Sequence, residues 1–562
     1  MILPILYLDT AEYPVTRKEK VMRILNAKRR VPPVVIKLFA SILICLALTA
    51  TAFASGDRKS RQRAREALRS GDYERAEKQF REALEKDAHD TDARLGLSFA
   101  LLKQRLLQDA YDHAARVILT EPLSSRAHAL LGATILASGD FRNSVEEFRT
   151  ALSIQENEAL AICGLAMVDF YENRLESAIR GLRRAVSLDA GEADYVFNLG
   201  QAAARSERYK EAADAYERFL EIAPKADADR RDRIRGLIDF LRYLGRQASL
   251  YGLSGNKTTI PFESVDSRPI LKVRVNNGRE PLRFVLDTGS GMCVISEETA
   301  KKLGLRAVAR GGLARAVGGG GKFEIVYGFL NSLDIGDVRV ERVPVYIRHF
   351  YDEQNRVDGY LGLSVINKFI ASLDYGENLF MLRRPSEESA KDLWAMPVSK
   401  DGEVTLPDGV LEIPLRTTSS GFLSGEVRLE GVEKPLNFII DTGASVSVVS
   451  ERLAVEEDLH SYLQPTRLRI FGAAGIAEDV KSLLLPKLML GTFTRERISA
   501  AVLDLDPVNE TAGFTQDGIL GANYLRHFRV SFNFQRGQIR LEPLRKKAKV
   551  ADVVRPEDHL DR

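Results

Sequence analysis

Few residues of this 562-residue chain are cysteine, histidine or tryptophan. The three cysteines, Cys45, Cys163 and Cys293, have neither the spacing of a metal site nor that of a disulfide framework. The seven histidines form no HExxH pattern, so we expect no metal site and no cofactor. The 81 basic and 78 acidic residues nearly cancel and are interspersed along most of the chain. Composition therefore gives no reason to expect a nucleic-acid partner.

The N-terminal residues have the composition of a targeting segment. A basic stretch over 17–30 precedes an apolar run from Leu38 to Phe53, which closes with Ala52-Phe53-Ala54. This order is typical of a cleaved secretory signal. The alternative is an uncleaved membrane anchor, although the run is short for a span of about 20 residues. Under either interpretation of residues 1–54, we expect the rest of the protein to be exported and to lie in the periplasm or another extracytoplasmic space. Under the second interpretation, the N-terminal segment anchors it to the membrane.

Residues 57–226 repeat with a period of about 34 residues, which is held through five consecutive blocks. Small residues recur at the eighth and twentieth positions of each block. They are Ala64, Ser98, Gly132, Ala166 and Gly200 at the eighth, and Ala76, Ala110, Ser144, Ala178 and Ala212 at the twentieth. Small residues at fixed offsets let two helices approach closely, and stacked blocks bury each other's apolar faces. We therefore predict a helix, a short turn and a second helix in every block.

The repeated region resembles the tetratricopeptide repeat family over the whole of 57–226. An amphipathic helix over 230–250 is predicted to cap the array, which gives a repeat domain at 57–250. The apolar side of this helix carries Leu237, Ile238, Leu241, Leu244 and Leu250. The resemblance implies a concave surface that binds a peptide or a protein partner. The alternative is that the array serves only as a rigid spacer or an assembly handle.

The chain beyond Gly255 has a pattern typical of β-structure, and this pattern occurs in two copies. Short alternating apolar runs separated by Gly, Asn and Pro predict strands and hairpins. Residues 281–296 align without a gap with 435–450, and residues 358–375 match 517–534. We therefore expect two β-domains joined by a linker and followed by a polar tail. Their predicted bounds are 258–384 for the first domain, 385–403 for the linker, 404–545 for the second domain and 546–562 for the tail.

Each copy places an Asp-Thr-Gly sequence directly after a buried strand, at Asp287 and at Asp441. A strand end that is buried should reject Asp unless the carboxylate is hydrogen-bonded or functional. Two such loops face to face would hold two carboxyls that cannot both ionise easily, so that the pair keeps one proton. The ionised member could then activate a water while the protonated member polarises a carbonyl. No metal or covalent intermediate is needed.

A glycine-rich cluster follows each Asp at the same distance along the chain. The glycines are Gly318, Gly319 and Gly320 in the first copy and Gly472 and Gly475 in the second. Strand-like residues flank both clusters, which predicts two mobile hairpins that close over an extended peptide.

These features resemble retropepsin-type aspartic peptidase domains over nearly all of 258–545. The resemblance rests on the two Asp-Thr-Gly loops, the glycine-rich hairpins and two later segments that begin at Asp358 and Asp517. It implies a multidomain α + β protein: an all-α tetratricopeptide-repeat solenoid, then two all-β barrels that form a pseudo-dimer. It also implies that Asp287 and Asp441 are the catalytic pair. Their active-site support would come from Thr288, Gly289, Thr442 and Gly443.

The predicted function is that of an aspartic-type endopeptidase acting on peptide or unfolded protein, with a protein partner or the substrate docked on the repeats. The alternative is an exported scaffold that binds peptides or proteins without cutting them. Pairing of the two halves within one chain or between two chains is left open. Cys293, which aligns with Ser447, is expected to be a small core residue. Asp358 and Asp517 are expected to cap turns.

Overall fold

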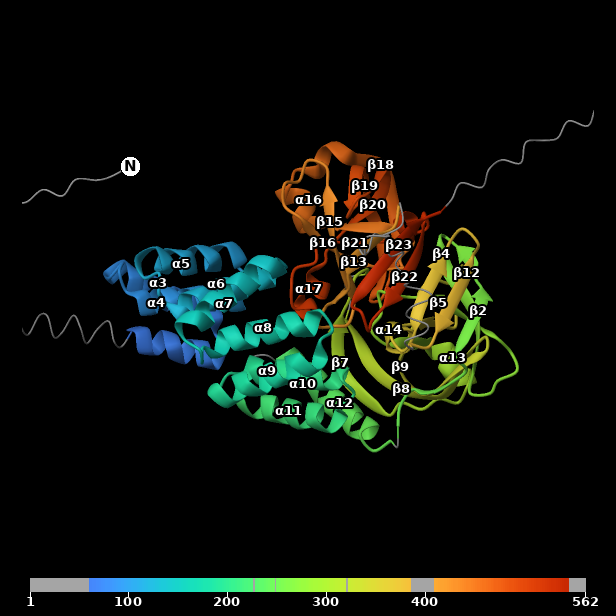
Figure 1. Ribbon diagram of the computed structural model, residues 1–562, viewed down its shortest axis with the longest axis horizontal. Helices are drawn as coiled ribbons and strands as arrows, with labels where there is room; N and C mark the ends of the chain where they lie inside the picture. The colour runs from blue at the N-terminus through green and yellow to red at the C-terminus, as the bar shows by residue number, and fades with distance from the viewer. Residues whose placement is uncertain (1–59, 226–227, 248, 320–321, 386–408, 545–562) are drawn as a thin grey trace, which may run out of the picture.

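The computed structural model describes residues 60–225, 228–247, 249–319, 322–385 and 409–544. A helical array forms one part of the molecule, and three β-sheets form the other (Figure 1). The expected signal or anchor at 1–54, nearly all of the expected linker and the tail at 546–562 lie outside the described residues. No helix within the described ranges is both long and apolar enough to cross a membrane.

Paired antiparallel helices fill the five repeated blocks, as the period predicts. The first pair is the helical stretch 60–70 with α3 (Tyr73–Lys86). The next pairs are α4 (Thr91–Lys103) with α5 (Leu107–Thr120), α6 (Ser125–Ser138) with α7 (Phe141–Ile154), α8 (Ala159–Tyr171) with α9 (Leu175–Leu188), and α10 (Ala193–Arg205) with α11 (Tyr209–Ile222). The described part of the chain thus begins with a solenoid of tetratricopeptide-repeat type.

The recurring small residues are where the helices touch. A Cβ atom on Gly132 would lie 2.8 Å from the Phe148 ring, and one on Gly200 would lie 2.8 Å from the Tyr216 ring. Ser98 is fully buried and its hydroxyl donates to the carbonyl of Ala110 at 2.7 Å. A larger side chain at any of these positions would force the helices apart.

The capping helix is shorter than the predicted span of 230–250. Helix α12 runs over Ala228–Leu244, so Leu250 lies beyond its end. Turns follow the end of the helix, and the Gln247 N–H donates to the Leu244 carbonyl in one of them. Strand β1 (Gly252–Ser254) then pairs with β9 (Val338–Arg348) of the first β-domain, which draws the chain out of the helix. The first sheet therefore starts before the predicted residue 258.

Two sheets with the same plan make up most of the β-region. The first has the order β1-β9-β6-β10-β5-β4-β8-β7, with β3 added beside β4. Its other strands are β3 (Glu263–Val265), β4 (Arg268–Val275), β5 (Leu282–Leu286), β6 (Cys293–Ser296), β7 (Ala309–Arg315), β8 (Lys322–Ile335) and β10 (Gly359–Leu361). Short helices α13 (Glu297–Lys302) and α14 (Leu363–Ile366) follow β6 and β10.

The second sheet has the order β14-β15-β16-β21-β17-β20-β19-β18. Its strands are β14 (Arg416–Thr417), β15 (Leu423–Leu429), β16 (Leu436–Ile440), β17 (Ser447–Ser450), β18 (Leu463–Gly472), β19 (Gly475–Leu490), β20 (Phe493–Leu503) and β21 (Gly518–Leu520). Its helical turns are α16 (Glu451–Glu456), η1 (Leu459–Tyr462), α17 (Asp506–Ala512) and α18 (Ala522–Leu525). Strands β5 and β16, and likewise β6 and β17, correspond at the offset that carries Asp287 onto Asp441.

A third, six-stranded sheet joins the two halves in the order β13-β23-β22-β11-β12-β2. The first half supplies β2 (Lys257–Pro261), β11 (Ile370–Asp374) and β12 (Leu379–Arg383), and the second supplies β13 (Leu411–Pro414), β22 (Phe528–Asn533) and β23 (Gln538–Pro543). At the junction the hydroxyls of Ser372 and Ser531 lie 2.7 Å apart, and Asp374 pairs with Arg529 at 2.6 Å. One hydrophobic core runs through both halves. The pairing that the sequence left open is therefore within one chain, as a pseudo-dimer.

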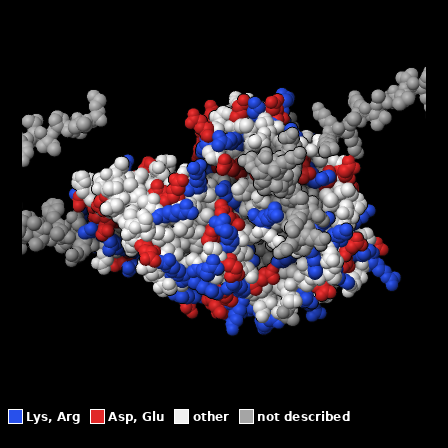
Figure 2. Space-filling model, in the orientation of Figure 1, with Lys and Arg blue, Asp and Glu red and all other residues white. Residues whose placement is uncertain are grey.

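The solenoid packs against both halves of the β-region. Helix α12 lies on β7, close enough that a Cβ on Gly236 would meet the Arg310 carbonyl oxygen at 1.9 Å. On the other side, the Phe514 ring lies 5.0 Å from that of Phe141 and 5.1 Å from that of Tyr171. Acidic and basic side chains are interspersed over both parts on the face shown in Figure 2.

Candidate active site

Strands β5 and β16 end at Leu286 and Ile440, and each is followed at once by an Asp of an Asp-Thr-Gly loop. Strand β10 runs parallel to β5, and the N–H of Asp287 donates to the Leu361 carbonyl at 3.0 Å. Strand β21 holds β16 in the same way, and the N–H of Asp441 donates to the Leu520 carbonyl at 3.0 Å. The later repeated segments therefore anchor the two Asp residues side by side.

The two threonines lock the loops together across the halves. The Thr288 hydroxyl donates to the Ile440 carbonyl at 2.8 Å, and the Thr442 hydroxyl donates to the Leu286 carbonyl at 2.7 Å. Each hydroxyl also accepts the backbone N–H of the opposite threonine, at 3.1 and 3.2 Å. Both threonines are fully buried. This reciprocal network fixes the position of each Asp relative to the other.

The two glycines make room for the carboxyls. A Cβ atom on Gly289 would lie 2.4 Å from the carboxyl carbon of Asp441, and one on Gly443 would lie 2.8 Å from a carboxyl oxygen of Asp287. The glycine N–H groups also donate to the Asp of their own loop, at 2.9 Å for Gly289 and 2.7 Å for Gly443. Any side chain at either position would collide with the opposite carboxyl.

The two carboxyls are buried next to each other, and the pKa of both is raised. Burial, the charge of Asp441 and the hydrogen bond between the two carboxyls raise the pKa of Asp287 well above its ordinary value. Burial also raises the pKa of Asp441, against hydrogen bonds from the N–H groups of Gly443 and Ala444 and from the Asp287 carboxyl. Two raised pKa values in carboxyls that are bonded to each other are what a pair that holds one proton between its members would have.

Hairpins β7–β8 and β18–β19 lie at the two glycine-rich clusters, and we call them the first flap and the second flap. A Cβ atom on Gly318 would lie 2.7 Å from the Gly472 Cα, and one on Gly319 would lie 2.6 Å from the Gly475 Cα. The N–H of Ala473 donates to the Val317 carbonyl at 3.1 Å, so the two tips touch. Gly320 lies outside the described residues.

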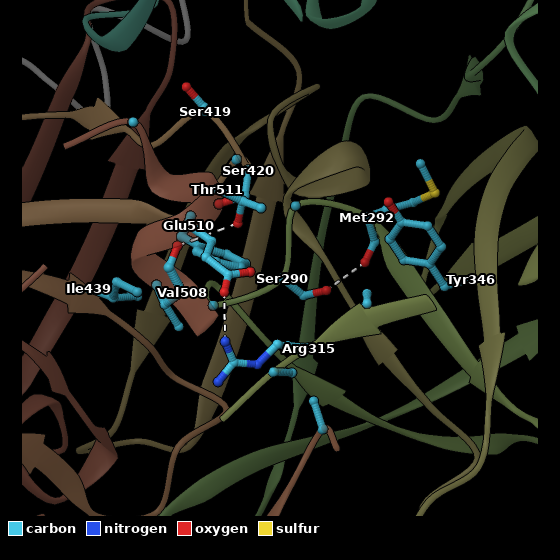
Figure 3. A pocket seen from close by; sticks show the side chains of 18 of the residues that line it. Ser290, Met292, Arg315, Tyr346, Ser419, Ser420, Ile439, Val508, Glu510 and Thr511 are labelled. Atoms are coloured by element: carbon cyan, nitrogen blue, oxygen red, sulfur yellow. Dashed lines mark hydrogen bonds and ion pairs between the residues drawn. The ribbon is translucent and has the colours of Figure 1, made fainter. Parts of the chain in front are cut away.

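A continuous cavity of about 1440 Å³ lies beneath the flaps and extends to the inner face of the solenoid. Its lining includes Asp287 and Asp441 at one end and Phe99, Met167 and Gln201 of α4, α8 and α10 at the other. Figure 3 shows part of this cavity, where side chains of the two halves face each other. There Arg315 of the first flap bonds Glu510 of α17 at 2.6 Å.

Other residues singled out in the sequence have structural positions. Asp358 accepts the Arg283 N–H at 2.8 Å, and Asp517 accepts the Asn437 N–H at 2.9 Å, so each holds the strand before its Asp-Thr-Gly loop. Cys293 is fully buried, and its Sγ accepts the N–H of Gly362 at 3.4 Å. Ser447 does the same for Gly521 at 3.1 Å, so Cys293 is a small core residue as expected.

Sequence reasoning missed three arginines around the cavity. Arg315 ties the first flap to the second half, and Arg348 reaches the tip of the second flap. Arg205 of α10 donates to the carbonyl of Ser419 at 3.1 Å and to the hydroxyl of Thr417 at 2.9 Å. No local motif marks these arginines, since each finds its partner far away along the chain.

Residues 271–365 and 425–524 match the family model of the aspartyl proteases, and residues 67–133 and 163–227 match models of the tetratricopeptide repeat. The protein is therefore protease-like, with a tetratricopeptide-repeat domain ahead of two aspartyl-protease-like domains. No curated protein matches the chain.

Among solved structures, the chain is similar to a thermophilic repeat protein of Thermus thermophilus. The identity is 20%, over 32% of this chain and 98% of that one, with a TM-score of 0.29. It is also similar to PilF of Pseudomonas aeruginosa, at 13% identity over 34% of this chain and 87% of that one, with a TM-score of 0.26.

Proposed function

We propose that the protein is an aspartic endopeptidase that hydrolyses extended peptide or unfolded protein. The observation that carries this proposal is the contact between the buried carboxyls of Asp287 and Asp441, both with raised pKa, at the base of a cavity that two flaps cover. Binding alone would require neither two carboxyls in contact nor the network of Thr288 and Thr442 that holds them.

The mechanism follows from the protonation of the pair. Ionised Asp441 takes a proton from a water molecule, whose oxygen attacks the scissile carbonyl carbon. Protonated Asp287 donates a hydrogen bond to the carbonyl oxygen and then its proton, so that a neutral tetrahedral intermediate forms. The proton on Asp441 next passes to the peptide nitrogen while Asp287 takes one back from a hydroxyl of the intermediate. The C–N bond breaks, and the pair returns to its singly protonated state.

We infer that the repeats bind a distal part of the same substrate. The inner faces of α4, α8 and α10 line the cavity that holds the Asp pair, so one polypeptide can occupy both. Gln201→Trp, on this inner face, should reduce cleavage of an unfolded protein more than cleavage of a short peptide. Arg180→Trp on the exposed outer face of α9 is the matched control and should affect neither. Equal effects of the two variants would contradict the docking role.

We also propose that this activity lies outside the cytoplasm, on the basis of the signal-like sequence before residue 55. A phosphatase that is active only after export, fused behind residue 60, should be active in cells. An inactive but intact fusion would contradict export.

The decisive experiment is peptide-library cleavage by residues 55–562, read by mass spectrometry from acid to neutral pH. Asp287→Asn and Asp441→Asn should each reduce cleavage by about 10²–10⁴-fold, since each removes one member of an acid–base pair. The isosteric changes leave the loops folded, which circular dichroism and thermal unfolding can verify. Absence of cuts by the folded wild-type protein, or survival of activity in one variant, would overturn the proposal in favour of a non-catalytic peptide-binding scaffold.

A further inference from the structure

Arg348, the last residue of β9, reaches from the wall of the cleft to both flaps. Its Nη2 donates a 2.7 Å hydrogen bond to the carbonyl oxygen of Ala473, at the tip of the second flap. Its guanidinium also lies over the ring of Phe323 in the first flap, 5.2 Å from the ring centroid. The side chain thus lies where a bound peptide would pass between the Asp pair and the flaps.

Among the residues that the structure describes, no Asp or Glu forms an ion pair with Arg348. Its Nε is buried, and within the described chain no hydrogen-bond partner reaches it. Asp352, which is close in sequence, pairs with Arg268 at 3.4 Å. Asp287 acts on Arg348 through its charge, but within the described chain no hydrogen bond or ion pair joins the two side chains. Burial accordingly lowers the pKa of Arg348, and a buried cation of this kind is stabilised when an anion is supplied.

The equivalent position in the other half is apolar. Strand pairing places Arg348 opposite Ser296, and it places Leu503 opposite Ser450, the counterpart of Ser296 in the second copy. Leu503 also lines the cavity. Because the halves are related by a pseudo-two-fold axis through the Asp pair, the two positions face substrate residues on opposite sides of the scissile bond.

We propose that Arg348 is a specificity-determining residue that binds a substrate carboxylate on one side of the cut, while Leu503 makes the symmetric subsite apolar. The expected substrates are therefore extended peptides that carry a carboxylate near the scissile bond. This inference rests on the proposed peptidase function. The planar guanidinium suits a carboxylate through paired, charge-assisted hydrogen bonds. The carboxylate comes from an Asp or Glu side chain or from a peptide C-terminus.

The test is a mass-spectrometric cleavage profile of a peptide library for wild-type, Arg348→Leu, Arg348→Lys and Arg348→Leu/Leu503→Arg proteins. The wild type should favour Glu and Asp over Gln and Asn at one position by about 10- to 100-fold. This preference should vanish in Arg348→Leu through a higher KM, survive in part in Arg348→Lys, and move across the cut in the swapped variant. Libraries with free and with amidated C-termini separate side-chain from terminal carboxylates.

A profile that Arg348→Leu leaves unchanged would overturn the proposal, even if cleavage itself is established. If the wild type cuts nothing, peptide binding to the Asp287→Asn/Asp441→Asn protein is measured instead, by fluorescence anisotropy. Labelled libraries rich in Glu should bind more tightly than matched Gln libraries and lose this advantage in the added Arg348→Leu variant. Equal binding of the two libraries would contradict the role of Arg348 separately from that of the Asp pair.

Discussion

The two flaps have the same hairpin design, but their surroundings differ. The first flap is covered on its outer side by α12, where Phe240 stacks on Tyr327 with ring centroids 4.2 Å apart. Tyr243 adds an edge contact to Phe329, also in the first flap. Strand β18 of the second flap instead leaves Leu463 and Phe471 each 37% exposed.

This difference indicates how the cleft opens. Lifting the first flap would separate Phe240 from Tyr327 and expose apolar surface, in addition to breaking the contacts at the tips. Lifting the second flap would break the tip contacts and move Leu468 and Ile470 away from the apolar cluster around Leu503. We therefore expect the second flap to move while the solenoid holds the first one still. Under the proposed function, the two halves would contribute equally to the Asp pair, and the second flap would open to admit substrate.

The strongest test of symmetry concerns the threonines. Thr288→Val and Thr442→Val should each lower the free energy of unfolding by about 2–4 kcal/mol, because each leaves a buried carbonyl and a buried N–H unpaired. Both should also reduce cleavage severely. Urea denaturation measures the first effect, and Thr→Ser at each position, which keeps the hydroxyl, is the control. Clearly unequal losses would show that the two loops do not brace each other reciprocally.

The contact between α12 and the first flap gives the next largest expected effect on stability. Phe240→Ala should destabilise the protein by about 3 kcal/mol, because a fully buried aromatic side chain is lost. Phe471→Ala, on the exposed flap, should change stability by no more than about 0.5 kcal/mol. Hydrogen exchange should show β7–β8 protected in the wild type and exchanging as fast as β18–β19 in Phe240→Ala. Equal protection of the two flaps in the wild type would contradict the inferred asymmetry.

The sheet that joins the halves contains the ion pair of Asp374 and Arg529, whose contribution to stability depends on pH. Burial alone would raise the pKa of Asp374, but hydrogen bonds from Arg529 and from the Glu377 N–H lower it overall. The pair thus stabilises the fold above the unfolded-state pKa of about 3.9, and this stability is lost as pH falls through the folded-state pKa. Arg529→Met should cost about 1–2 kcal/mol at neutral pH, since Arg529 is partly exposed, and much less in acid. Thermal unfolding between pH 2 and 7 tests this, and a pH-independent loss would contradict it.

The smallest expected effect is a gain in stability when Asp287 is replaced. The pKa of Asp287 is raised in the folded protein, so stability should decline as pH rises from about 4 through the folded-state pKa. Asp287→Asn removes this decline and should stabilise the protein by about 1 kcal/mol near neutral pH, with little change below pH 4. Calorimetry across this range is the measurement. A variant that is less stable at neutral pH would show that the carboxyl also serves the fold.

Much of the architecture follows from patterns within short stretches. The repeat period, with its small residues at fixed positions, predicts the helix pairs, and the Asp-Thr-Gly loops identify the Asp pair. The end of α12 could not be found this way, because β1 pairing with β9 decides it. The sequence also did not show that Arg348 and Leu503 take matching positions in the two halves. The offset between the copies changes somewhere between Ser296 and Asp358, and only strand register shows which residues correspond.

The sequence by itself determined which groups are available: two carboxyls, two threonines, the glycines that leave room for them and the period of the solenoid. These depend on local preference and on residue identity, which are visible one stretch at a time. Tertiary structure alone decided that the carboxyls meet within one chain, that α12 packs on the first flap and that Arg348 and Leu503 take matching places in the two halves. Each of these depends on contacts between residues far apart in the chain, where the same local pattern is compatible with several partners.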